Sequence, residues 1–135
     1  MKTPKEIVDL MLDGDAFSRW MKVSVEKLCK GHCTLSCVVR AEMLNGHHIA
    51  HGGISYSLSD SALAFAANSY GNKCVSIETS ISHLLPVKEG DTLTAICDEI
   101  NRGKTIAIYT VNIFNQKNEK VSTFKGTVNI SREIW

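Results

Sequence analysis

Residues 45–70 read NGHHIAHGGISYSLSDSALAFAANSY, and this stretch decides how the chain folds. A glycine pair, Gly52 and Gly53, stands where a loop gives way to an apolar run that holds a single acid, Asp60. The first N–H groups of a helix have no partner within it, and such groups can polarise a carbonyl. A carboxylate among apolar neighbours is costly unless something uses or satisfies it. The stretch therefore indicates a site for hydrolysis of an acyl group rather than a packing motif.

A long helix is predicted over residues 53–70, with Gly71 available for a left-handed cap. Its apolar residues cover most of the circumference, so we expect the helix to be buried rather than to lie on the surface. These residues are Ile54, Leu58, Ala62, Leu63, Phe65, Ala66 and Ala67.

The remaining segments predict one domain over residues 1–135, beginning with a helical segment over residues 1–21. Thr3-Pro4 is typical of a helix start and Gly14 of a helix end, and a second apolar turn follows at residues 17–21. Six strands are predicted over residues 22–30, 32–40, 74–85, 92–100, 105–114 and 121–130. The simplest packing wraps one antiparallel sheet around the one helix, an α+β arrangement.

The composition excludes several classes of protein. A net charge of +1 argues against a nucleic-acid partner. No run of about 18 apolar residues exists, so no membrane helix is expected, and residues 1–12 lack the apolar core of a signal peptide. The five cysteines include no Cys-x-x-Cys pair, so we expect buried free thiols in a reducing cytoplasm rather than disulfides or a zinc knuckle.

Several motifs together resemble those of the hot-dog fold acyl-CoA thioesterases, particularly the phenylacetate-pathway (PaaI-like) group. They are Asn45-Gly46, His51-Gly52-Gly53, Leu58-Ser59-Asp60, Asn68-Ser69-Tyr70-Gly71, Val75-Ser76-Ile77-Glu78 and Gly90-Asp91-Thr92-Leu93-Thr94-Ala95. His-Gly-Gly alone is a weak motif, but with Asp60 at this offset and this strand pattern it is fairly specific. The resemblance implies a hot-dog fold, in which an antiparallel sheet wraps around one long central helix. It also implies hydrolysis of acyl-CoA to a carboxylic acid and free CoA by a homo-oligomer, a dimer or possibly a tetramer, without a metal or bound cofactor.

The resemblance also implies a role for each catalytic residue. Gly52 would donate its backbone N–H to the thioester oxygen, helped by a hydrogen bond from the side chain of Asn45. Asp60 would be the general base or the nucleophile, and Ser76 would orient the attacking water. In this fold such sites usually lie between two subunits.

The substrate-binding mouth of the helix is expected to include His51 and Gly53. A zinc site is an alternative for this loop, because His47 and His51 are spaced i, i+4 and His48 lies between them. The segment is predicted as loop, and no cysteine or acid lies close in sequence, so we expect no metal. His51 is then expected to bond to the loop backbone, whether or not it also touches substrate.

Each site residue also has a purely structural explanation. Asp60 can be an acid at a partly exposed helix position, and Gly52 and Gly53 a tight turn with unusual backbone angles. Asn45 can be a turn residue, and Ser76 a polar side chain on a strand face. An apolar setting for Asp60 would favour the neutral acid and raise its pKa, which suits a base that works near neutral pH.

Helix geometry predicts a shared site without reference to any family. Gly52 and Asp60 are eight positions apart, and a rise of ~1.5 Å per residue separates them by about 12 Å. A base must lie within ~3 Å of the atom it serves, or one water away. One chain's Gly52 and its own Asp60 therefore cannot serve the same carbonyl. Two helices packed antiparallel about a two-fold axis would bring Asp60 of one chain near Gly52 of the other.

Other functions would need different residues. A non-catalytic acyl-CoA-binding or sensor protein of the same fold would keep the cleft but need no carboxylate at position 60. A hydratase would need an acid and a base suited to a hydroxyacyl chain, and no Asp-His pair is placed for that. Ser55 and Ser57 form no Gly-x-Ser-x-Gly elbow, which argues against a serine hydrolase. The identity of the acyl group is not encoded in any local motif.

Overall fold

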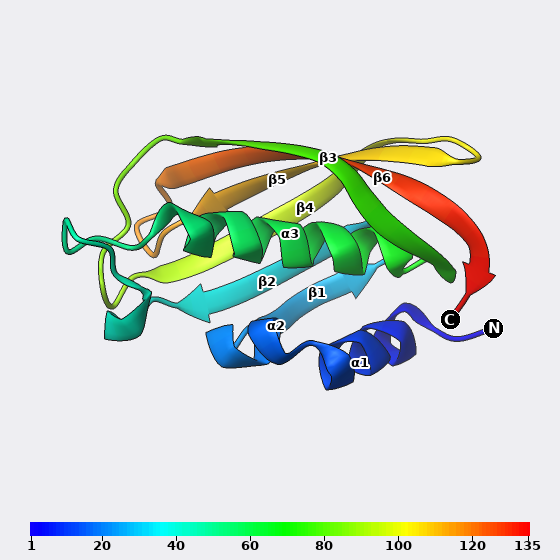
Figure 1. The fold of residues 1–135 in the computed structure, drawn as a ribbon, viewed down its shortest axis with the longest axis horizontal. Helices are drawn as coiled ribbons and strands as arrows, with labels where there is room; N and C mark the ends of the chain where they lie inside the picture. Colours follow the sequence, from blue (N-terminus) through cyan, green and yellow to red (C-terminus); the bar gives the residue numbers. More distant parts are fainter.

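The computed structural model describes residues 1–135 as a six-stranded antiparallel sheet that curls around one long helix (Figure 1). The fold class predicted from the sequence is confirmed. The elements in chain order are α1 (Pro4–Gly14), α2 (Ala16–Met21), β1 (Ser24–Cys29), β2 (His32–Val38), the 3₁₀ turn η1 (Ala41–Met43), α3 (Gly52–Asn68), β3 (Asn72–His83), β4 (Thr92–Arg102), β5 (Ile106–Phe114) and β6 (Lys120–Ile134).

The strand order is β1-β2-β4-β5-β6-β3, and every neighbouring pair is antiparallel. β3 follows α3 in the chain but pairs with β6 at the far edge, so the connection over residues 84–91 must return to β4 beside β2. That connection passes the end of the sheet at which α3 begins (Figure 1). β3 is an edge strand, and two of its apolar side chains, Val75 and Ile77, are 69% and 58% exposed rather than buried.

Most of α3 is buried against the sheet, as its apolar circumference predicts. One face remains incompletely covered along the length of the helix, and we call it the open stripe. Its residues recur every three or four positions: Gly53, Tyr56, Ser57, Asp60, Ser61 and Ala64. α1 and α2 lie to one side of this helix (Figure 1). The catalytic candidate Asp60 thus lies on the one face of α3 that the chain itself leaves open.

The side chain of Asn68 makes several hydrogen bonds at the C-terminal end of α3. Its Nδ2 donates to the carbonyl oxygens of Ala64 and Cys74, and its Oδ1 accepts from the Cys74 N–H and the Trp135 indole. Arg102 adds a hydrogen bond from Nη1 to the carbonyl oxygen of Ala67. The bond to Ala67 satisfies a carbonyl group that the helix end leaves unpaired, and the bonds of Asn68 tie this end of α3 to β3 and to the C-terminal residue.

Close packing between helix and sheet is clearest at Gly126 on β6. A Cβ built at Gly126 would lie 2.6 Å from Cδ2 of Leu63, closer than real Cβ contacts allow. The Leu63 side chain of α3 therefore fills the space that a side chain at position 126 would occupy.

The N-terminal segment folds as predicted, with a reciprocal cap at its start. The Glu6 N–H donates to Oγ1 of Thr3, and the Thr3 N–H donates to the Glu6 carboxylate. α1 ends at Gly14. In α2 the aromatic residues Phe17 and Trp20 remain 51% and 43% exposed, and their rings lie 5.6 Å apart.

All five cysteines are free thiols, and three of them are fully buried as expected. The prediction of a buried thiol is wrong for Cys29, which is exposed on β1 at the other edge of the sheet. None of the helices combines the length and apolar character that a membrane crossing would need.

Candidate active site

The mouth of α3 leaves one backbone donor unused. His51 caps the helix, and its Nδ1 accepts a hydrogen bond of 2.8 Å from the Gly53 N–H. The neighbouring Gly52 N–H, at the first helical position, has no acceptor in the chain. Aligned peptide dipoles give this end of the helix a partial positive charge. The Gly52 N–H is therefore free to donate to a ligand, and His51 shapes the turn that presents it; the predicted bond to a thioester oxygen stays a prediction.

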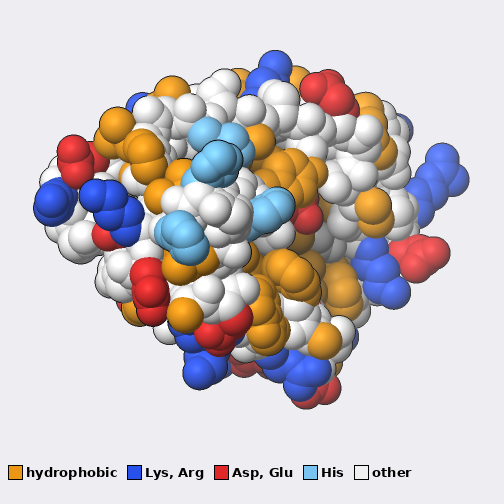
Figure 2. Space-filling model, turned by 60° about the vertical axis from the view of Figure 1, so that its left-hand side comes forward, with side chains coloured by type: hydrophobic (Ala, Val, Ile, Leu, Met, Phe, Trp, Pro, Cys, Tyr) orange, Lys and Arg blue, Asp and Glu red, His pale blue; other side chains and the backbone are white.

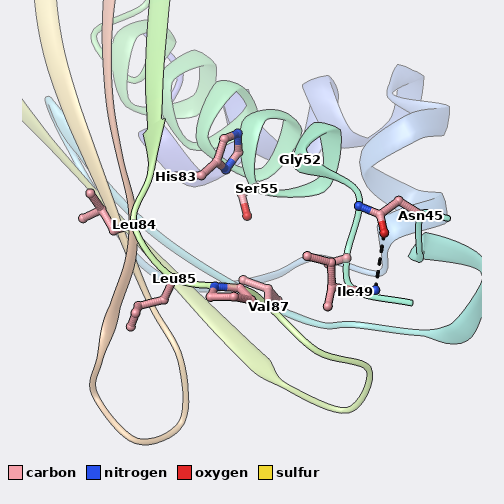
Figure 3. A pocket seen from close by; sticks show the side chains of 10 residues that line it. Asn45, Ile49, Gly52, Ser55, His83, Leu84, Leu85 and Val87 are labelled. Atoms are coloured by element: carbon pink, nitrogen blue, oxygen red, sulfur yellow. Dashed lines mark hydrogen bonds between the residues drawn. The ribbon is translucent and has the colours of Figure 1, made fainter. Parts of the chain in front are cut away.

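Asn45 contributes a second free donor. Its Oδ1 accepts from the N–H groups of His47 and Ile49, at 2.9 and 3.4 Å, which fixes the tight loop before the helix. Its Nδ2 has no partner in the chain and points away from that turn (Figure 3). A role in the turn and a role in binding substrate are thus compatible for Asn45, since they use different atoms of its side chain.

These two donors line a cavity of about 350 Å³. One wall is the loop before α3 and the other is the connection after β3, including Leu84, Leu85 and Val87 (Figure 3). A hydrogen bond of 2.7 Å from the Ala50 N–H to the Val87 carbonyl oxygen ties the two walls together. The cavity is mainly apolar around its few polar groups, as small-molecule sites commonly are.

His83 is a functional candidate that sequence reasoning missed. It is the last residue of β3, yet its ring lies so close to Gly52 that a Cβ there would be 3.1 Å from His83 Nε2. Figure 3 shows the ring against the first turns of α3, inside the cavity. Thirty-one positions separate the two residues, and only the return of β3 along the sheet brings them together. No local motif signals such a contact.

Asp60 lies two turns further along α3 in a different cavity, of about 180 Å³. It is half-buried, and the cavity walls are mostly apolar. Burial raises the pKa of the Asp60 carboxyl, and the negative charge of Asp15 raises it further. This is the direction expected for a carboxylate tuned to accept a proton near neutral pH.

Ser76 lines the same cavity as Asp60, from the neighbouring strand β3. The register of β3 against β6 shifts between Ser76 and Glu78, which marks an irregularity at this place in the strand. Ser76 and Asp60 thus line one cavity, and the role of this hydroxyl in orienting a water for the carboxylate stays a prediction.

Within one chain the predicted site residues fall into separate groups. Asn45 and Gly52 share the first cavity, and Asp60 and Ser76 share the second. His51 and Gly53 line a third hollow, of about 290 Å³, whose walls include the exposed aromatic residues of α2. The chain alone therefore presents the donors and the carboxylate at different places along α3.

Histidine side chains gather on one face of the molecule, with apolar side chains between them (Figure 2). They do not combine with one another or with cysteines and acids into a cluster of three that could hold a metal ion. The chemistry available here is that of backbone and amide donors, a carboxylate and a hydroxyl.

The free N–H at the start of α3, the half-buried carboxylate and the curled sheet agree with the match to a known protein family. The family model described as Thioesterase superfamily matches residues 47–122, more than half of the chain. This chain therefore belongs to the thioesterase superfamily and has its hot-dog fold.

Individual relatives confirm the resemblance to the PaaI-like group. The protein "Acyl-coenzyme A thioesterase PaaI" of Escherichia coli K12 is 36% identical over 116 residues, covering 86% of this chain and 83% of that protein. The structure of the E. coli PaaI protein, from the phenylacetic acid degradation operon, matches with a TM-score of 0.94 at 32% identity, covering 97% and 95% of the two chains. A hypothetical thioesterase of Streptococcus pneumoniae, solved with coenzyme A, matches with a TM-score of 0.87 at 27% identity, covering 93% and 98%.

Proposed function

We propose that this protein is an acyl-CoA thioesterase, which hydrolyses a thioester to a carboxylic acid and free CoA. The observation that carries the proposal is the Gly52 N–H, left without an acceptor at the positive end of α3 and facing an open cavity. Relatives named acyl-coenzyme A thioesterase, and a solved relative with bound coenzyme A, support the same substrate class.

In the proposed reaction the thioester carbonyl oxygen accepts hydrogen bonds from the Gly52 N–H and from Nδ2 of Asn45. These donors stabilise the negative charge that develops on this oxygen as a nucleophile adds to the carbon. Asp60 either takes a proton from an attacking water, which Ser76 orients, or attacks directly to form an anhydride that water then cleaves. In both routes the C–S bond breaks, its electron pair stays on sulfur, and CoA leaves and gains a proton. Neither route requires a metal or a bound cofactor.

We propose further that each site is completed by two subunits. Gly52 and Asp60 of one chain line separate cavities, so a single copy offers no place where both reach one carbonyl. The open stripe of α3 consists largely of small residues, including Gly53, Ser57 and Ala64, which allow a second helix to approach closely. An antiparallel second copy would bring its Gly52 and Asn45 to Asp60 and Ser76 of the first.

The edge strand β3 supports the same dimer. An edge strand presents unpaired backbone groups, and Val75 and Ile77 add exposed apolar side chains beside the open stripe. Apolar side chains grouped on a surface are typical of a contact with another protein. We therefore place the proposed two-fold contact along β3 and α3; pairing of dimers into tetramers is a second possible level of assembly.

The proposed partners and location follow from the chemistry of the chain. The substrate is an acyl-CoA, and a net charge of +1 gives no general attraction to nucleic acid. Five free thiols suit a reducing compartment, and we propose the cytoplasm. The substrate-binding role of His51 and Gly53 remains part of the proposal, through their place at the mouth of the helix.

A non-catalytic acyl-CoA-binding or sensor protein is the alternative function. The half-buried Asp60 and its raised pKa favour the enzyme, because a binding protein has no use for a base placed beside a free hydroxyl.

The decisive test replaces Asp60 with Asn, which keeps the shape of the side chain and removes its charge. We expect Asp60→Asn to lose at least about 100-fold in kcat, as removal of an acid–base group typically does, while its Tm stays close to that of the parent. Release of free thiol from a panel of acyl-CoAs measures the rate. Asp13→Asn, at an exposed position in α1, is the matched control and should hydrolyse at the parent rate. Parent-level turnover by Asp60→Asn would refute the catalytic assignment, and a parent protein that binds acyl-CoA without releasing thiol would be the sensor.

A further inference from the structure

A chain of hydrogen bonds connects the N-terminal segment to α3 next to Asp60. Asp15 caps α2: its Oδ1 accepts from the Ser18 N–H at 2.9 Å and its Oδ2 from the Ser18 hydroxyl at 2.6 Å. The hydroxyl oxygens of Ser18 and Ser61 lie 2.8 Å apart, and Ser61 follows Asp60 in α3. Since the one hydroxyl hydrogen of Ser18 goes to Asp15, Ser61 donates to Ser18.

The hydrogen bonds between Asp15 and Ser18 hold the Asp15 carboxylate in one orientation. Ser18 is only 1% exposed, so the two hydrogen bonds of its hydroxyl, to Asp15 and to Ser61, are shielded from competing water. Asp15 makes both of its bonds to the same residue, which fixes the orientation of its carboxylate. The carboxylate is therefore held at a set place relative to α3 rather than free to turn into solvent.

We propose that Asp15, held against α3 through Ser18 and Ser61, is a positioning residue that places a fixed negative charge beside Asp60. The proposal rests on the proposed function, in which Asp60 is the base or nucleophile. Asp15 raises the pKa of Asp60 in addition to the larger effect of burial. A higher proton affinity makes Asp60 a stronger base, within the limit that it must stay ionised at the working pH.

The other groups around Asp60 do not carry charge that could substitute for Asp15. Leu63 and Ala64 come from α3, Val75 and Ser76 from β3, and the wall is completed by Val128 of β6. The remaining wall residue is Cys74, whose thiol has a pKa raised by burial and is neutral near pH 7. Among charged side chains, Asp15 is the one that acts on Asp60.

The test is the pH dependence of kcat/KM for Asp15→Asn. Asn caps a helix about as well as Asp and has the same shape, so α2 should keep its start. Without the charge, the pKa of Asp60 falls, and the base form persists to lower pH. We expect the acidic limb of kcat/KM to move to lower pH by about 0.3 to 1 unit, the range for a charge acting through partly screened surroundings. Asp13→Asn, two positions earlier in the exposed part of α1, is the matched control and should keep the parent profile.

A second measurement, the dependence on salt, distinguishes an effect of the Asp15 charge from an effect on the structure. Raising the ionic strength should narrow the difference between Asp15→Asn and the parent, because salt screens the interaction. An acidic limb of kcat/KM identical to that of the parent, or a uniform loss of kcat/KM at every pH with a lowered Tm, overturns the proposal.

If Asp15→Asn does not fold, Ser61→Ala replaces it. This variant removes the hydrogen bond between α2 and α3, so the acidic limb of kcat/KM should move in the same direction. An unchanged acidic limb overturns the proposal. Parent-level turnover by Asp60→Asn would instead show that the catalytic assignment of Asp60 is wrong, and a parent protein that binds acyl-CoA without releasing thiol would show that the proposed function is wrong.

Discussion

At the scale of single residues, the site depends on a glycine with a free N–H and on the side chains that keep it free. His51 takes the N–H of Gly53 and so leaves that of Gly52 to a ligand. Asn45 divides its amide between the two tasks, with the oxygen holding the loop and the nitrogen left for substrate. The geometry of the mouth thus comes from hydrogen bonds within residues 45–53, which are the loop before the helix and its first two positions.

Proline at position 52 gives a direct test of that N–H. Proline is well accepted at the first helical position and has no N–H, and the extended ψ of 137° at His51 suits a residue before proline. We expect Gly52→Pro to lose about 100- to 1000-fold in kcat, the usual cost of an oxyanion-hole donor. Circular dichroism and Tm will check that the helix persists.

Alanine at the same position is the matched control, because it keeps the N–H. Its Cβ would lie 3.1 Å from His83 Nε2, so the ring must yield by a few tenths of an ångström. Gly52→Ala should therefore retain most of the activity that Gly52→Pro loses. Equal loss in both variants would mean that the space under His83 matters rather than the donor.

The sequence indicated the mouth and the carboxylate but not the residues that act on them. Asn45, His51, Gly52 and Asp60 lie within sixteen positions, so a helix and its preceding loop are enough to relate them. His83, at the end of β3, lies against Gly52 of α3, and Asp15, the cap of α2, is connected to α3 through Ser18. Both positions depend on how the whole chain packs. No periodicity or motif records such a contact.

At the scale of elements, the predicted helix and strands all exist, with ends displaced for physical reasons. α3 ends at Asn68 rather than at residue 70, because the Ser69 hydroxyl and Arg102 Nη1 donate to the carbonyl oxygens of Ala66 and Ala67, to which a further turn would have bonded. β6 continues to Ile134 rather than to residue 130, because its end pairs with the start of β3 at Asn72. The partner that prolongs a strand cannot be recognised from the strand's own sequence.

The edge strand β3 carries a prediction about assembly. Replacing Ile77 with Asp puts a charge at the centre of the proposed contact, and desolvating that charge on dimer formation is costly. We expect Ile77→Asp to dissociate to monomers and to lose thioesterase activity while keeping its circular dichroism spectrum. Analytical ultracentrifugation at micromolar concentration measures the first effect and thiol release the second. Ile100→Asp on β4, at a residue 56% exposed, is the control. An Ile77→Asp protein that remains an active dimer would place the contact elsewhere.

At the scale of the whole molecule, one chain holds the proposed donors and the proposed base in cavities that do not meet. The separation follows from helix geometry and is preserved in the fold, since the donors and the carboxylate occupy different cavities along α3. The sequence was sufficient to predict this separation, because it needs only the rise of a helix. It was not sufficient to predict which surface of a second copy supplies the missing half, which depends on the shape of β3 and the open stripe.

Mixing two inactive variants tests the shared site directly. Asp60→Asn lacks the carboxylate and Gly52→Pro lacks the donor, so a mixed dimer would contain one intact site and one doubly defective site. After random exchange of subunits about half of the dimers are mixed, and activity should recover to about a quarter of the parent level. Each variant taken through the same unfolding and refolding alone is the control. Absence of recovery, when native mass spectrometry detects mixed dimers, would mean that each chain completes its own site.

The close approach at Gly126 has a consequence for the catalytic carboxylate. Leu63, which fills the space where a side chain at Gly126 would be, also forms part of the wall beside Asp60. The Leu63 side chain keeps its place because the residue that faces it has only a hydrogen in place of a side chain. A methyl group there would force the end of Leu63 to move and so change the apolar wall that surrounds the acid. In the proposed mechanism, the proton affinity of the base is thus sensitive to a position on another element of the fold, far away in the sequence.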